Sequence, residues 1–206
     1  MTLTIAVVGA ARVGKTLFCI NFAEYLGARS LSYIECGSAG EGRGTLSPAA
    51  AREMMVHRGR RSGAVVRTFT VHLSPRQTWR RIALIDTASL VEKKPLTRAA
   101  RTALLLTLQA IHSAAAVLQL VDLSCHDPAR REFDDAVWRH LADYCREQGK
   151  LFLTAGSKAD LYDGSLQAPF ASTEKMVFIS SLTRAGFPRL QRCLLGAVGP
   201  SAQEMK

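Results

Sequence analysis

Short apolar runs and helical stretches alternate along most of the chain. Val, Ile and Leu dominate the runs, as in strands buried on both faces, and they cover residues 3–9, 63–73, 77–86, 114–123, 150–155 and 175–180. The helical stretches repeat apolar residues every three or four positions, and they cover 15–27, 97–112, the segment after Asp127-Pro128 and a final helix from about Pro188. The alternation predicts an α/β fold of three layers with a mostly parallel central sheet. The turn Ser74-Pro75-Arg76 joins two runs in a hairpin, so one antiparallel edge strand is expected.

One segment departs from this alternation. Residues 36–62 hold four glycines within eight positions, a short helix candidate at Ser47-Pro48 and a basic run at 57–61. A loop of this length in a compact domain is functional or mobile in most proteins. We therefore expect one domain over residues 1–199, a mobile segment at 36–62 and a frayed tail at 200–206.

Charge and cysteines limit the partners and the compartment. The formal net charge is +10, which favours anionic partners such as nucleotides, nucleic acids or acidic lipids. The five cysteines form no CxxC pair, which is typical of scattered thiols in a reducing compartment. The amino terminus lacks a basic region and a cleavage site of a signal peptide, and polar residues interrupt the apolar segment 103–123. We expect a cytoplasmic protein, with peripheral attachment to a membrane as the alternative.

The strongest candidate chemistry follows the first apolar run. Residues 9–16 read GAARVGKT, which matches G-x-x-x-x-G-K-[ST] between a predicted strand and a predicted helix. Backbone N–H groups of such a loop bind phosphate oxygens, the lysine places a cation on the β and γ oxygens, and the hydroxyl is a Mg²⁺ ligand. The predicted phosphate-binding residues are Gly9, Ala11, Arg12, Val13, Gly14, Lys15, Thr16 and Leu17.

A second acidic position follows the run IALID. Asp86 resembles the acidic magnesium site that P-loop proteins carry at the end of a strand. Together with the Thr16 hydroxyl it predicts a Mg²⁺ site. The competing interpretation of Asp86 is a helix cap.

Two short motifs near the carboxyl end bear on which base is bound. Ser157-Lys158-Ala159-Asp160 follows the run KLFLTA and resembles the N-K-x-D motif of GTPases, with Ser in the Asn place. Its Asp carboxylate would accept from guanine N1–H and the exocyclic amine, and adenine lacks both donors on that edge. Ser180-Ser181-Leu182 resembles the loop whose backbone N–H meets guanine O6. An exposed charged turn is the competing interpretation of Lys158 and Asp160.

The order of these motifs resembles the Era/Obg-like branch of the translation-factor-related P-loop GTPases over about residues 3–198. The resemblance implies a Ras-like domain that binds GTP and GDP with Mg²⁺ and acts as a switch, with 36–62 as its first switch segment. The chain departs from the D-x-x-G motif, since Ser89 stands in the Gly place, and Leu90 stands where Ras-like proteins carry a water-orienting Gln. These departures predict slow hydrolysis without a partner.

The resemblance also implies roles at two less certain positions. Thr45 is the best candidate for the switch threonine that ligates Mg²⁺, although it lies far upstream of the strand near 64. Arg12 stands where related proteins often carry Asn, which helps to hold a monovalent cation near the phosphates. We expect Arg12 to replace that cation, to act as an arginine finger in cis or toward a partner, or else to point into solvent. The predicted catalytic residues are thus Lys15, Arg12 and Thr45.

The partner beyond the nucleotide stays open. Basic residues in 57–61, at Arg76, Arg80 and Arg81, and between Lys93 and Arg101 predict a surface for RNA, an acidic protein effector or activator, or membrane lipid, and the alternative is a solvated face. Two other functions compete with the switch: an interaction module with little hydrolysis, motivated by Ser89 and Leu90, and an ATP-using P-loop enzyme, which the SKAD motif disfavours.

Overall fold

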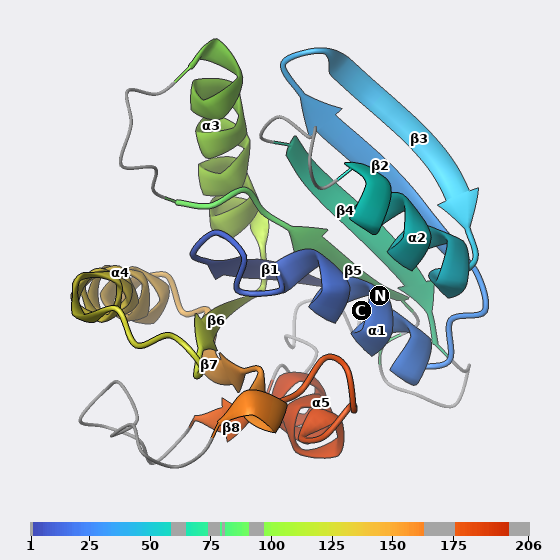
Figure 1. The fold of residues 1–206 in the computed structure, drawn as a ribbon. Helices are drawn as coiled ribbons and strands as arrows, with labels where there is room; N and C mark the ends of the chain where they lie inside the picture. Colours follow the sequence, from blue (N-terminus) through green and yellow to red (C-terminus); the bar gives the residue numbers. More distant parts are fainter. Residues whose placement is uncertain are drawn as a thin grey trace, which may run out of the picture.

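The computed structural model describes residues 2–58, 65–73, 79, 81–90, 97–162 and 176–197. These residues form one mixed sheet with helices on both faces (Figure 1). The strands are β1 (Thr2–Gly9), β2 (Leu31–Gly37), β3 (Gly40–Leu46), β4 (Val65–His72), β5 (Arg81–Asp86), β6 (Ala116–Asp122), β7 (Leu151–Ser157) and β8 (Val177–Phe178). The helices are α1 (Lys15–Tyr25), α2 (Pro48–Arg58), α3 (Arg98–Ser113), α4 (Pro128–Glu147), α5 (Phe187–Ala197) and the 3₁₀ turn η1 (Ala159–Leu161).

The strand order is β3-β2-β4-β5-β1-β6-β7-β8. Strands β5, β1, β6, β7 and β8 run parallel to one another, whereas β4 is antiparallel to β5, β2 to β4 and β3 to β2. The predicted α/β class, with a mostly parallel sheet and an antiparallel edge, is therefore confirmed, although three strands joined by antiparallel pairing (β4, β2 and β3) stand where one edge strand was expected. The predicted hairpin is the β4–β5 pair, although β5 begins at Arg81 rather than at 77, and residues 74–78 lie outside the described part of the chain.

The edge of the sheet differs most from expectation. Residues 31–58, here called the insertion, add the β2–β3 hairpin and α2 between α1 and β4. The irregular loop expected from residue 36 is therefore not found between 36 and 58, and residues 59–62 are not described. Glycines are rare in strands, but a Cβ on Gly44 would lie 2.7 Å from the Tyr33 hydroxyl, so β3 packs closely under this ring. The helix candidate at Ser47-Pro48 is confirmed as α2, whose Ala50 N–H donates to Ser47 Oγ at 3.1 Å.

Two apolar layers hold the helices to the sheet. Helices α1, α2 and α5 lie on one face and α3 and α4 on the other (Figure 1). In the first layer Phe187 of α5 meets Phe18 and Phe22 of α1 edge to face, with ring centroids 5.8 and 5.2 Å apart. Such pairs add about 0.5–1.5 kcal/mol each to the burial of their area. This packing fixes α1, and therefore the loop before it, against the sheet.

The parallel strands all end on the same side of the sheet, here called its carboxyl end. Register pairs Val7 with Asp86, and Asp122 with Ser157, so the loops after β1, β5, β6 and β7 leave the sheet together. In open α/β sheets this end is where ligands bind. Segment 103–123 is the end of α3 followed by β6, as predicted, and within the described residues no helix has the length and apolar character needed to cross a membrane.

Candidate functional site

The loop between β1 and α1 is shaped by its backbone. Gly9 has φ 147°, and a Cβ there would lie 2.5 Å from the Leu120 carbonyl oxygen of β6, so only glycine fits without a shift. Arg12 (φ 63°) and Gly14 (φ 98°) are in left-handed conformations and turn the chain back into α1. Val13 is buried and anchors the loop from beneath. The loop therefore reverses the direction of the chain in a tight turn between β1 and α1.

The Lys15 side chain folds back over this loop. Its Nζ donates to the carbonyls of Gly9 and Ala10, both at 2.9 Å, and the residue is only 8% exposed. Helix α1 begins here without a side-chain cap from Gly14 and without an acidic residue in its first turn. The N–H groups at a helix start carry partial positive charge, so a cation and a helix N-terminus converge on one loop. Such an arrangement is chemically suited to a phosphate group.

A buried carboxylate lies beside the loop at the end of β5. Asp86 is 3% exposed; burial raises its pKa, and the hydrogen bond with the Thr16 side chain and the charges of Lys15 and Arg67 act in the opposite direction. The next residue, Thr87, fastens this end to β1 by donating its hydroxyl to the Val7 carbonyl at 2.8 Å. Mg²⁺ prefers such hard oxygen ligands and needs few from protein, because waters and phosphate oxygens complete its shell.

The residues present therefore fit Mg²⁺. Within the described part of the chain no cluster of three His, Cys, Asp or Glu side chains could hold a metal by itself. A magnesium ion here would rely on Thr16, Asp86 and the oxygens of a bound phosphate.

The loop after β7 is attached to the phosphate loop. Ser157 Oγ donates to the Val13 carbonyl at 2.9 Å, and Ser157 is 2% exposed. Lys158 has φ 59° and its Nζ lies 2.6 Å from Asp122 Oδ2. Burial alone would raise the pKa of Asp122, but hydrogen bonds from Lys158 and Ser124 lower it. Asp160, in η1, is exposed and available to a ligand.

The last predicted loop lies against this one. The Ala159 N–H donates to the Ile179 carbonyl at 3.0 Å, which joins η1 to the residues before Ser180. Ser180 and Ser181 are buried, whereas Leu182 is 71% exposed. Asn21 of α1 donates from Nδ2 to the Ser181 carbonyl at 2.6 Å. The structure thus brings together the predicted phosphate, metal and base residues at one edge of the sheet.

Thr45 does not join them. It lies in β3, four strands from β1, at 3.3 Å from Ser32 Oγ. Register aligns Thr45 with Ser32 and Thr70, whereas Asp86 aligns with Arg67, Glu35 and Gly42 at the other end. Thr45 is therefore displaced along the strands as well as across the sheet. The prediction that it ligates Mg²⁺ does not fit this arrangement, because the hairpin extends the sheet instead of folding back over the loop.

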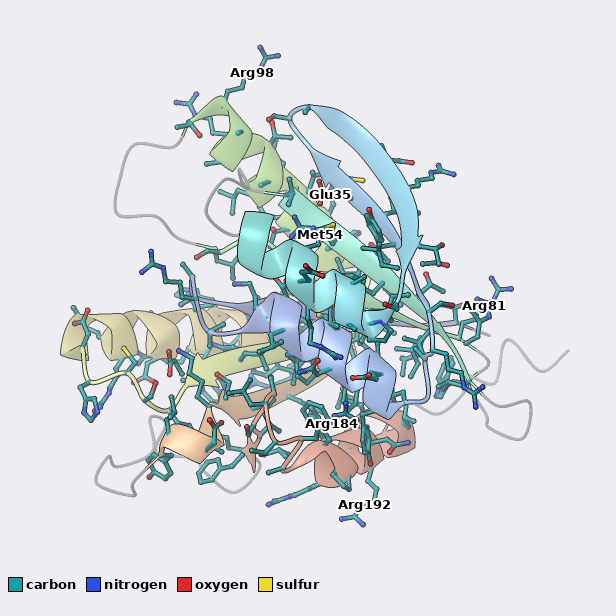
Figure 2. The ribbon with its side chains drawn as sticks, turned by 45° about the vertical axis from the view of Figure 1, so that its right-hand side comes forward. Glu35, Met54, Arg81, Arg98, Arg184 and Arg192 are labelled. Atoms are coloured by element: carbon teal, nitrogen blue, oxygen red, sulfur yellow. The ribbon has the colours of Figure 1, made fainter. Side chains whose placement is uncertain are left out.

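The remaining residues singled out from the sequence lie in and around the phosphate loop, under α3 and α4, and on β5. Arg12 is exposed in the phosphate loop, and Leu17 is half-buried on α1. Leu90 packs against the apolar layer under α3 and α4, so its side chain is held by the core. Among the basic residues, Arg81 begins β5 at the end opposite Asp86, and Figure 2 shows Arg81 and Arg98 well separated. Of the basic residues predicted to form a partner surface, only Arg81, Arg98 and Arg101 have described side chains, so the prediction concerns mainly residues outside the described part of the chain.

Four residues of the site were not predicted from sequence. They are Asn21, Arg67, Asp122 and Ser124. Asp122 ends an apolar run just as Asp86 does, so the same signal could have found it. Asn21 and Arg67 act through partners distant in sequence, and no local pattern marks them.

Comparisons with known proteins agree on the fold. A scan of protein-family models and a search of curated proteins give no match. Among solved structures, Era from Aquifex aeolicus bound to GDP and AlF4⁻ is 13% identical with a TM-score of 0.58, covering 97% of this chain and 58% of its own. Era in complex with MgGDPNP and nucleotides 1506–1542 of 16S ribosomal RNA is 15% identical with a TM-score of 0.58, covering 99% and 60%. The G-domain of FeoB from Methanococcus jannaschii is 14% identical with a TM-score of 0.50, covering 94% and 95%.

The chain spans somewhat less than two thirds of the Era chains and nearly the whole FeoB G-domain. These likenesses concern the fold. The chain has the fold of a P-loop GTPase domain, as its motifs predict.

Proposed function

We propose that this protein binds GTP and GDP with Mg²⁺ and works as a slow GTPase, a switch whose state is set by the bound nucleotide. The observation that carries the proposal is the hydrogen bond from Ser157 Oγ to the Val13 carbonyl, because it joins the candidate base loop to the phosphate loop. A ligand that reaches both loops is a nucleotide. The Era structures with GDP and MgGDPNP support the same ligand class.

Each part of the nucleotide has a partner of suitable chemistry. Backbone N–H groups of residues 11–17 and the Lys15 ammonium bind phosphate oxygens. The Asp160 carboxylate would accept from guanine N1–H and the exocyclic amine, while the N–H groups of Ser181 and Leu182 would approach O6; the Ser180 N–H already donates to the Ala185 carbonyl at 3.1 Å. The ion pair with Asp122 holds Lys158 beside the loop, where its stem covers the base.

Hydrolysis in this site depends on position and charge. Bound Mg²⁺ would neutralise charge on the phosphates between Thr16 and Asp86. Lys15 stabilises charge that develops on the γ-phosphoryl oxygens. No side-chain base is evident among the described residues of the site, and Leu90, which is half-buried against the apolar layer under α3 and α4, offers no group to orient a water. Water is therefore oriented weakly, which makes the reaction slow. Arg12, exposed in the loop, is the residue we propose as a cation toward the phosphates or toward a partner.

The second candidate function is a guanine-nucleotide-binding interaction module with little hydrolysis. The packing of Leu90 and the Ser89 substitution favour it. Phosphate release during a single turnover separates the two functions. An ATP-using enzyme is a weaker alternative, because Asp160 has no matching donors on adenine.

Partners and location are proposals as well. An effector or activator protein would supply what the slow site lacks. RNA remains an alternative anionic partner, since one Era structure contains ribosomal RNA, and an acidic membrane surface is another. The free cysteines Cys19, Cys36, Cys125, Cys145 and Cys193 favour a cytoplasmic location, including the surface of a membrane.

A change of base preference in an Asp160 variant tests whether this residue recognises guanine. The variant Asp160→Asn replaces one acceptor oxygen by an amide donor, which matches xanthine, whose position 2 carries an oxygen. We expect GDP affinity to fall about 100-fold and xanthosine diphosphate affinity to rise by a similar factor, since an unpaired polar group in a site is strongly rejected. Asp143→Asn, an exposed aspartate on α4, is the matched control. Unchanged base preference in Asp160→Asn would reject guanine recognition by this residue.

A further inference from the structure

The insertion is joined by side chains to both ends of the proposed nucleotide site. One connection, the base link, runs from Arg52 of α2 through Asn21 to Ser181. The other, the metal link, runs from Glu35 of β2 through Arg67 to Asp86. Each connection ends on a residue of a predicted motif, Ser181 or Asp86, and passes through one intermediate side chain outside the insertion, Asn21 of α1 or Arg67 of β4. The insertion is thus linked to both the proposed base site and the proposed metal site.

The base link is a chain of satisfied hydrogen bonds. Arg52 Nη1 donates to Asn21 Oδ1 at 2.9 Å and to Glu24 Oε2 at 2.7 Å. Asn21 is 5% exposed and uses its other amide atom to hold the Ser181 carbonyl at 2.6 Å. Because both ends of the amide are engaged, the side chain has one orientation.

A second arginine completes this cluster. Arg184 Nη2 donates to Glu24 Oε2 at 2.6 Å, so the loop 180–184 is also held through its far end. Figure 2 shows Arg184 below α1, on the side away from α2 and Glu35. The hydrogen bond from Arg52 lowers the pKa of Glu24, as expected where an arginine pairs with the carboxylate. Helix α2 therefore reaches the base loop across α1.

The metal link is a row of alternating charges across the sheet. Register pairs Arg67 with Asp86 on one side and with Glu35 on the other. Arg67 Nε lies 2.6 Å from Glu35 Oε2, whereas its Nη1 lies 3.8 Å from Asp86 Oδ2, beyond hydrogen-bond distance. Glu35 thus draws the guanidinium away from Asp86. Without Glu35, Arg67 would be free to pair fully with Asp86 and compete with a cation for it.

From these contacts we propose that the insertion is a built-in clamp that slows the release of guanine nucleotide through two positioning residues. Arg52 holds the base loop through Asn21, and Glu35 keeps Asp86 available to Mg²⁺ by restraining Arg67. The inference rests on the proposed function of the site. It also identifies the insertion as the element through which a partner would accelerate exchange, since displacing α2 or β2 loosens the base or the metal.

Dissociation of a fluorescent GDP, chased with excess GDP in Mg²⁺ and in EDTA, separates the two links. Arg52→Ala should release GDP about 10-fold faster in both conditions, because charged hydrogen bonds of this kind correspond to about one order of magnitude. Arg52→Lys, which keeps a donor toward Asn21 and Glu24, should recover most of the slow release. A role in folding alone would lower the melting temperature without this rescue.

Glu35→Ala should behave differently. The Mg²⁺ concentration that gives half of the maximal slowing of GDP dissociation should rise about 10-fold. The dissociation rate in EDTA should stay unchanged. The additional change Arg67→Met removes the competing cation and should restore the Mg²⁺ response. Arg43→Ala, which breaks an exposed ion pair with Glu41 within the same insertion, is the control and should match the unaltered protein.

The outcomes distinguish the clamp from the function beneath it. If the unaltered protein binds GDP but Arg52→Ala and Glu35→Ala release it at the unaltered rates, the clamp is wrong and the nucleotide site stands. A Glu35→Ala defect that Arg67→Met fails to restore also overturns the metal link. If the unaltered protein does not bind GDP, the proposed function fails first.

Discussion

Two halves of the proposed site are built in different ways. The binding half consists of the phosphate loop and the loops at 157–160 and 180–182, and short contacts between neighbouring loops hold it together. The sensing half consists of residues 86–90 with the adjoining edge of β4. Its contacts lead away from these loops to the edge strands of the sheet, as in the pairing of Arg67 with Glu35 of β2. The binding half is therefore held by its own loops, whereas the sensing half is tied to the insertion.

Leu90 illustrates the sensing half. It is half-buried and packs against the apolar layer under α3 and α4. An apolar side chain has no group that could orient a water near the phosphates. The neighbouring Ser89 keeps a backbone N–H but has less conformational freedom than glycine. These two positions are the reason why we propose slow turnover.

The largest expected effect breaks the binding half. Lys15→Ala removes a buried cation at the centre of the phosphate loop, and GDP affinity should fall by about 100-fold or more, because hydrogen bonds to charged groups contribute about 1.5–3 kcal/mol each. Calorimetry measures the loss. Lys150→Ala, a lysine that caps the α3 end by bonding to the His112 and Ala114 carbonyls, is the control. Undiminished affinity in Lys15→Ala would remove the phosphate loop from the account.

A smaller effect tests how the two binding loops are joined. Ser157→Ala deletes the donor to the Val13 carbonyl and leaves a buried acceptor unpaired. We expect about a 10-fold loss of GDP affinity, which corresponds to about 1.4 kcal/mol. Ser157→Asn, which restores an amide donor, should recover part of it. Equal affinity in Ser157→Ala and the unaltered chain would mean that the loops are held together by other contacts.

One substitution should improve the contact between the sensing half and the γ-phosphate. Ser89→Gly restores backbone freedom at the position where related motifs carry glycine. We expect the ratio of GTP to GDP affinity to rise a few-fold (about 1 kcal/mol or less), with GDP affinity itself unchanged. Parallel titrations of both nucleotides provide the ratio. A ratio that does not move would show that Ser89 does not limit γ-phosphate contact.

The smallest effect concerns stability at low pH. The pKa of Asp122 is lowered from 3.8 in the fold, so its ion pair with Lys158 stabilises the protein above that pH and is lost as the pH falls through the folded value. Asp122→Asn should lower the melting temperature at neutral pH by about 2–4 °C and by less near pH 3. Thermal unfolding at several pH values measures this difference. A melting temperature reduced equally at every pH would contradict the charge argument.

The two halves also differ in how far sequence could predict them. The phosphate loop was predictable because Gly9, Gly14 and Lys15 act within one local motif, and the core strands because their apolar runs are continuous. Strand β3 was missed because its glycines are typical of loops, and only its packing under Tyr33 makes them fit.

The choice of Thr45 failed for the same reason. A threonine in a glycine-rich segment resembles a switch residue as long as that segment is taken for a loop. Once β3 pairs with β2, the residue is held at the sheet edge. The pairing of β3 with β2 fixes the position of Thr45, and no local sequence pattern predicts that pairing. The pairing of Arg67 with Glu35 and Asp86 was hidden in the same way.

The central claim is that the site is selective for guanine nucleotides and turns them over slowly. The most direct test is calorimetric titration of Mg-GTP, Mg-GDP and Mg-ATP into the nucleotide-free protein, with phosphate release followed in the same samples. We expect binding of both guanine nucleotides, little or no binding of ATP, and phosphate release that is slow without a partner. ATP binding equal to or tighter than GTP binding, or no nucleotide binding at all, would contradict it.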